Sequence, residues 1–184
     1  MKRGFTLLEV FVGLTGGLLL FLGVLSIFSL SRTALHKGGD FAEITQNGRI
    51  ALERISREFR QAEEIVPPLS QTQSSPSLEI QFLDGHDLAV LTYIRYYITA
   101  QSLHRELAYY SLTSAPTVPV HYQDRNPDES PAAKTITEDE IVAEYITALA
   151  LWESPTSLIN ISLSLNKDNS ATTLTSALYG RNLH

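Results

Sequence analysis

The stretch MKRGFTLLE (Met1–Glu9), followed by the charge-free run VFVGLTGGLLLFLGVLSIFSLS (Val10–Ser31), decides the fold of this chain. A helix rises about 1.5 Å per residue, so this run reaches roughly 33 Å and covers a hydrocarbon core of about 30 Å. Lys2 and Arg3 precede the run, and basic flanking residues favour the cytoplasmic side of a membrane. The sequence therefore predicts a single-pass anchor with a cytoplasmic N-terminus and the remaining chain outside.

An alternative interpretation of this segment is a cleaved secretory signal, with Ser29-Leu30-Ser31 as the cleavage site. The length of the apolar run and the acidic Glu9 both favour an anchor. A carboxylate carried to the centre of a bilayer costs about 2.5–3.5 kcal/mol, and an export signal gains nothing from it. The presence of Glu9 therefore needs an explanation beyond export.

The ordered residues Gly4-Phe5-Thr6-Leu7-Leu8-Glu9, together with the apolar run, resemble the N-terminal signature of type IV prepilins and type II secretion pseudopilins. The resemblance implies that residues 1–4 are a leader peptide and that residues 5–31 are a transmembrane and assembly helix. A prepilin peptidase is then expected to cut between Gly4 and Phe5, and Phe5 to be N-methylated. Thr6 and Glu9 would serve subunit assembly, with the Glu9 carboxylate meeting the free amine of a neighbouring subunit.

Physical chemistry agrees with this role of Glu9. A lone carboxylate in apolar surroundings is costly, whereas a cation from the next subunit compensates it, so correct assembly relieves a penalty that the isolated subunit bears. The simpler interpretation is that Glu9 lies at the level of the lipid headgroups and is solvated.

Composition limits what the rest of the chain can be. About 150 residues follow the anchor, which is enough for one hydrophobic core. The net charge of −6 argues against a nucleic-acid surface, and the absence of cysteine means that packing alone holds the outside domain together. The five histidines occur in no metal or nucleophile motif. We therefore expect no catalytic residues, no metal and no cofactor, the alternative being an enzyme with an unpatterned catalytic triad.

Residues 32–66 are predicted to continue the membrane helix as an amphipathic segment. Its charged residues, among them Arg54 and Glu58 four positions apart, are interpreted as a solvated face rather than a partner-binding surface. Pro67-Pro68 ends the helix. The apolar residues recur every three or four positions and form one face: Ile44, Ala51, Leu52, Ile55, Phe59, Ala62 and Ile65.

Glycines mark weak points along the predicted helix. Gly38-Gly39 lowers its stability, and Asp40 is placed to cap a second helical segment there. Gly13 and Gly17 are spaced for close approach of a neighbouring helix, the alternative being ordinary tolerance of glycine in lipid.

Residues 67–184 are predicted to form a periplasmic β-rich domain. Asp84-Gly85 indicates a hairpin turn, and residues 100–102 a second turn. Because no helix is predicted between the strands, the fold class is α+β: a pilin-like long N-terminal helix packed on an antiparallel sheet. The predicted strands are 78–82, 88–98, 103–109, 146–152, 158–165 and 172–178.

Residues 124–144 are strongly acidic and contain two prolines. Carboxylates at this density are the ligands that calcium prefers, but their spacing is not that of an EF-hand loop. We interpret the segment as a flexible acidic loop, with a calcium site as the alternative.

The segments QNGRIALERISREFRQA (Gln46–Ala62) and YGRNL (Tyr179–Leu183) resemble the J-type minor pseudopilin and its relative, the W-type minor pilin. The compact size favours the J type. The resemblance implies a non-enzymatic subunit, in the bacterial inner membrane and then in a filament, that helps to initiate and cap the periplasmic pseudopilus of a type II secretion system. Its implied partners are other pseudopilins or pilins, the prepilin peptidase and the inner-membrane assembly platform.

Two other functions are open to the same sequence. A W-type minor pilin would prime assembly of a type IV pilus. A membrane-tethered periplasmic binding domain would need the same anchor but no filament, so replacement of Glu9 should leave it almost unaffected.

Overall fold

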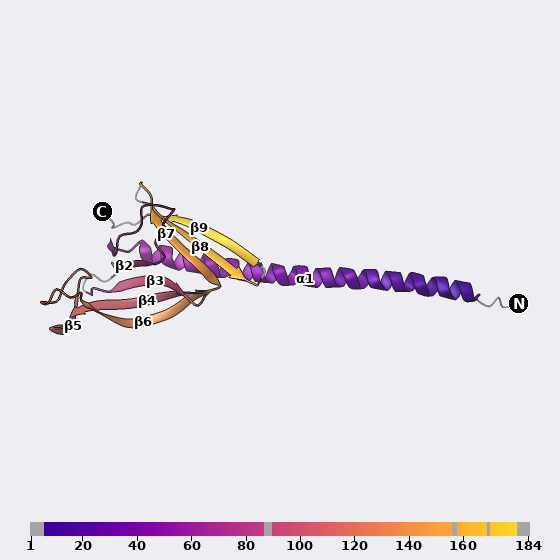
Figure 1. Ribbon diagram of the computed structural model, residues 1–184, viewed down its shortest axis with the longest axis horizontal. Coiled ribbons are helices and arrows are strands. Elements are labelled where there is room, and N and C mark those ends of the chain that lie inside the picture. The colour runs from indigo at the N-terminus through magenta and orange to yellow at the C-terminus, as the bar shows by residue number, and fades with distance from the viewer. Residues whose placement is uncertain (1–5, 87–89, 156–157, 169, 180–184) are drawn as a thin grey trace. The chain divides into compact units, whose positions relative to one another are not determined.

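The computed structural model describes residues 6–86, 90–155, 158–168 and 170–179. In this part of the chain one long helix is followed by nine strands (Figure 1). The chain divides into two compact units, Met1–Asp40 and Phe41–His184. The elements are α1 (Leu7–Phe59), β1 (Glu64–Ile65), β2 (Ile80–Leu83), β3 (Tyr93–Thr99), β4 (Ser102–Leu112), β5 (Ala115–Val120), β6 (Ala133–Glu144), β7 (Ile146–Glu153), β8 (Ile159–Lys167) and β9 (Ser170–Leu178).

The first unit is the N-terminal part of α1, and its apolar side chains are exposed. Leu20, for example, is 75% exposed. The helix continues through Gly38 and Gly39, so the prediction that Asp40 begins a second helical segment is wrong. Two interior glycines cost about 2 kcal/mol in total, but a break would leave helix-end N–H and C=O groups unpaired and require a new helix nucleus.

The helix ends at Phe59, seven residues before the predicted end at Val66. Glu64 and Ile65 instead form β1, which pairs with β2. Val66 precedes a proline and is therefore disfavoured in a helix, and its N–H donates to the carbonyl of Gln81 at 2.9 Å. Pairing with β2 thus satisfies backbone groups that a longer helix could not.

The first sheet has the strand order β1-β2-β3-β4-β5, with β6 along the other side of β4. The predicted hairpin is confirmed as the antiparallel pair of β2 and β3, although β3 begins at Tyr93 rather than Leu88, and residues 87–89 lie outside the described part. The predicted turn between β3 and β4 is also confirmed. Ala100 and Gln101 both have positive φ, at 48° and 62°, as a tight two-residue hairpin requires.

The interpretation of residues 124–144 as a flexible loop is wrong for their second half. Residues 133–144 form β6, a long strand that pairs antiparallel with β4. The acidic side chains Glu138, Asp139 and Glu140 are consecutive in this strand, and Glu138 and Glu140 pair with Arg105 of β4 and Arg54 of α1. These cations make an acidic strand stable where sequence alone favours a loop.

The second sheet consists of β7, β8 and β9 in that order, which confirms the last three predicted strands. The C-terminal part of α1 packs against both sheets (Figure 1). Gly48 permits the close approach of the second sheet, because a Cβ there would lie 2.5 Å from Leu174 Cδ1 and 3.0 Å from Leu165 Cδ1. The observed fold is thus α+β, with the predicted apolar face of the helix buried: Ile44, Ala51, Ile55, Phe59 and Ala62.

Candidate functional site

The N-terminal part of α1 is long and apolar enough to cross a membrane. None of its most apolar window is buried against another part of the chain. A helix that is apolar all round is stable only when lipid or other apolar helices surround it. The first candidate site is therefore this exposed helix and the polar residues at its start.

Thr6 and Glu9 form a capping box at the first turn of the helix. The Thr6 N–H donates to Glu9 Oε2 at 2.9 Å, and the Thr6 hydroxyl donates to the same oxygen at 3.0 Å. In return, the Glu9 N–H lies 3.3 Å from Thr6 Oγ1, which accepts its hydrogen bond. This reciprocal arrangement satisfies N–H groups that otherwise have no partner at a helix start.

The capping box gives Glu9 a role that sequence analysis missed. The pattern Thr-x-x-Glu before an apolar run was the available signal. Within its own chain the Glu9 carboxylate already has two donors, so the cost of placing it beside the apolar run is partly offset. Gly4 and Phe5, the predicted cleavage and methylation positions, lie outside the described residues.

A second group of polar residues joins α1 to the first sheet. Glu58 accepts hydrogen bonds from Arg105 Nε at 2.9 and 3.0 Å and from the Tyr96 hydroxyl at 2.7 Å. The side chains of Glu58 and Arg105 are only 15% and 11% exposed. Burial, reinforced by the negative charge of Glu58, raises the pKa of the Tyr96 phenol. Tyr96 therefore remains a neutral donor to the carboxylate.

Arg54 extends this group to the acidic strand β6. Its side chain lies 3.5 Å from Glu58 and also pairs with Glu140, while Arg105 lies 3.3 Å from Glu138. The interpretation of Arg54 and Glu58 as part of a solvated face is therefore wrong. These partly buried charges fix the helix to β4 and β6.

His104, one of the five histidines without a motif, lies on the opposite face of the first sheet. His104 Nδ1 lies 3.0 Å from Asp139 Oδ1, and the Tyr97 hydroxyl donates to Asp139 Oδ2 at 3.0 Å. The bond to His104 holds the pKa of Asp139 below its usual value. This group crosses β3, β4 and β6, and it stabilises the sheet. Among the described residues no cluster of three or more histidine, cysteine or acidic side chains is placed to hold a metal ion.

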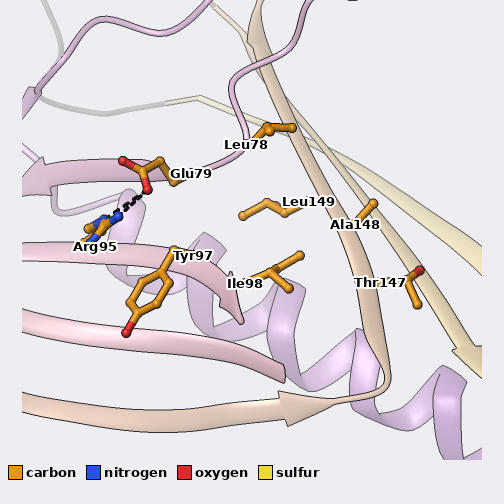
Figure 2. Close-up of a pocket in the computed structure, with 8 residues that line it drawn as sticks. All are labelled: Leu78, Glu79, Arg95, Tyr97, Ile98, Thr147, Ala148 and Leu149. Atoms are coloured by element: carbon orange, nitrogen blue, oxygen red, sulfur yellow. Dashed lines mark hydrogen bonds and ion pairs between the residues drawn. The ribbon is translucent and has the colours of Figure 1, made fainter. Parts of the chain in front are cut away.

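A hollow of about 420 Å³ lies between β3 and β7 (Figure 2). Figure 2 shows Glu79 and Arg95 joined at one end, with Arg95 beside Tyr97. The Arg95 guanidinium lies 4.5 Å from the centre of the Tyr97 ring. Because Arg95 is already paired, the hollow offers an apolar surface rather than a free charge. It is lined by Leu78, Glu79, Arg95, Tyr97, Ile98, Thr147, Ala148 and Leu149.

No protein-family model, curated protein or solved structure matches this chain. The resemblance described above therefore depends on the residues of the N-terminal segment and of the two shorter segments. Of those, Thr6 and Glu9 lie together at the start of the exposed helix and are joined by hydrogen bonds.

Proposed function

We propose that this chain is a membrane-anchored structural subunit of a pilin-like filament. More specifically, it acts as a minor pseudopilin that helps to initiate and cap the periplasmic pseudopilus of a type II secretion system. The observation that carries this proposal is the order of its N-terminal residues: Gly4-Phe5, the pair Thr6 and Glu9, and then a membrane-length run without charge.

The exposed helix supports a role in assembly. Apolar side chains all round its surface give neighbouring helices a continuous contact area, and the small residues Gly13 and Gly17 have open space around them. Small residues let helix backbones approach closely in a membrane. A bundle of such helices would leave each β-rich domain to pack laterally outside the bundle.

The pair Thr6 and Glu9 at the start of the helix supports an ordered assembly. Glu9 is held by Thr6 in the isolated chain, with both donors on one carboxylate oxygen, Oε2. A carboxylate can accept further hydrogen bonds, so Glu9 can also receive the terminal amine of a neighbouring subunit. In this proposal the amine is that of Phe5, freed by cleavage after Gly4.

The mass of the intact protein, purified from membranes of cells that contain a prepilin peptidase, tests this proposal. The expected mature chain begins at N-methylated Phe5. A matched Gly4→Leu variant should keep residues 1–4 in the same cells. A chain that keeps Met1 despite the peptidase, or one that begins at Arg32, contradicts the proposal, and the latter supports a secretory signal.

The alternative W-type minor pilin shares the anchor, the processing and Glu9, so the mass measurement does not distinguish it. Purification of the assembled filament distinguishes the two. A pseudopilin is expected with periplasmic secretion components, whereas a minor pilin is expected in surface pili.

A further inference from the structure

Strand β9 is the free edge of the second sheet. It pairs with β8 from Ser170 to Leu178, and no other described strand lies on its outer side. Its sequence SATTLTSAL contains no charge and no proline, and its pairing with β8 contains no bulge. Proteins usually protect a long edge strand with charges, prolines or bulges, because an unprotected edge is a template for another strand.

The other long edge of the molecule is protected in this way. Strand β6 contains two irregularities in its pairing with β4. It also carries acidic residues along its length: Glu138, Asp139, Glu140 and Glu144. The same chain therefore protects one edge and leaves the other open, which indicates that the outer side of β9 is used.

A hollow of about 420 Å³ runs beside this edge, between β9 and α1. A strand added to β9 would place alternate side chains over this hollow, because successive side chains of a strand point to opposite faces. The hollow is lined by Leu52, Glu53, Ser56, Arg57, Arg60 and Ser176.

The charge around the hollow selects the added strand. Arg57 and Arg60 are exposed, and neither makes an ion pair within the described part of the chain, in contrast to Arg54. Arg49, two to three turns earlier on the same exposed side, is also without an ion pair there. Glu53 is the single acidic residue among them, so this surface is positive on a chain with a net charge of −6.

We propose that the outer edge of β9 and the adjacent arginines of α1 form a docking groove for an extended acidic segment of a partner protein. The backbone of the segment pairs with β9 as a fourth strand of the second sheet. Its carboxylates, at alternate positions, pair with Arg57 and Arg60. This groove lies wholly within residues 41–184 and does not depend on a filament role.

Fluorescence anisotropy of the full-length chain in detergent tests the groove. The probe is a fluorescein-labelled nine-residue peptide in which threonine alternates with glutamate, matched in length to β9. We expect it to bind at least tenfold more tightly than the same peptide with lysine in place of glutamate. Hydrogen exchange should slow across residues 170–178 when the glutamate peptide is bound.

Two protein variants separate the groove from general charge attraction. The double variant Arg57→Glu/Arg60→Glu should weaken binding at least tenfold. The matched control Arg125→Glu, which changes an exposed arginine elsewhere in the domain, should change binding less than twofold. Equal effects of these variants, or equal binding of the lysine peptide, would overturn the assignment of charge.

A third peptide tests strand addition without altering the protein. N-methylation of alternate backbone nitrogens keeps every charge of the glutamate peptide but removes its donors to β9. Two such peptides, methylated in the two alternate sets, cover both orientations, and at least one should lose binding tenfold or more. If both methylated peptides bind as tightly as the unmodified peptide, or if the unmodified peptide does not bind at millimolar concentration, the proposal is overturned.

Discussion

Variants of Thr6 and Glu9 can separate two roles of the same carboxylate. In the structure, Glu9 completes the capping box of α1, and in the proposed filament it also receives the amine of a neighbouring subunit. Glu9→Gln keeps a side-chain oxygen that can cap the helix, since glutamine also occurs in capping boxes, but removes the charge. Thr6→Ala removes the N-cap hydroxyl and keeps the charge, and Glu9→Ala removes the charge together with the carboxylate half of the capping box.

The expected magnitudes differ enough to be measured. Loss of a threonine N-cap costs about 0.5–2 kcal/mol, which corresponds to roughly a two- to thirtyfold change in an equilibrium. Loss of the carboxylate from an ion pair in apolar surroundings leaves an uncompensated ammonium and costs about 3–5 kcal/mol, roughly a hundred- to several thousandfold. Assembly should therefore fall by at least a hundredfold in Glu9→Gln and Glu9→Ala, but by at most about thirtyfold in Thr6→Ala.

Photo-crosslinking in isolated membranes measures this difference. Benzoylphenylalanine replaces Phe21, a large exposed side chain of the apolar helix, and the crosslinked fraction reports contact with neighbouring subunits. Equal amounts of each variant in the membrane fraction are the control for insertion. If Glu9→Gln crosslinks as well as the unaltered chain while Thr6→Ala does not, Glu9 acts only as a cap and the charge-pairing argument is refuted.

Three further predictions concern stability, measured by unfolding of the detergent-solubilised chain. Glu58→Ala leaves the guanidinium of Arg105 without its closest carboxylate and should lower the free energy of unfolding by about 3 kcal/mol, the lower end of the range for a buried pair; an unchanged denaturant midpoint would contradict this. Gly48→Leu should cost about 1–3 kcal/mol through overpacking, whereas Gly39→Leu, in open space, should leave thermal stability unchanged or slightly raised. The hydrogen bond from His104 lowers the pKa of Asp139 in the folded state, so the ionised carboxylate stabilises the fold above about pH 4. This contribution is lost as the pH falls through the folded-state pKa. Asp139→Asn should show a smaller loss of stability on acidification, and an identical acid limb would argue against a role of the Asp139 carboxylate.

The buried face of α1 could be predicted because its signal is local. Ile44, Ile55 and Phe59 recur at helical spacing, and the structure buries all three. Strand β5 gives the opposite case, since Pro116 and Pro119 lie within it and argue against a strand. In the structure β5 pairs only with the last residues of β4, from Tyr110 to Leu112, and ends the strand order, and such an edge position tolerates proline. That position depends on the three-dimensional fold and could not be predicted from the sequence of β5.

Polar contacts, too, could be predicted only where the two residues are close in the sequence. Thr6 and Glu9 are three residues apart, so the capping box was accessible to sequence analysis. The partner of Glu58, by contrast, is Arg105, which is 47 residues away in the chain. Residue types and spacing give no sign of such a pair, and a charged helix with its partners unknown is most simply interpreted as solvated.

Arg54 and Arg57 lie on different sides of α1 and have different roles. Arg54 and Arg57 are three residues apart, yet Arg54 contacts Glu58 and Glu140, whereas Arg57 lies exposed beside the open edge of β9. Strand β6 is held beside β4 by their pairing, so its carboxylates contact the side of the helix that carries Arg54 and not the side that carries Arg57. One set of charges therefore holds the helix to its sheet, and the other remains accessible to a second molecule.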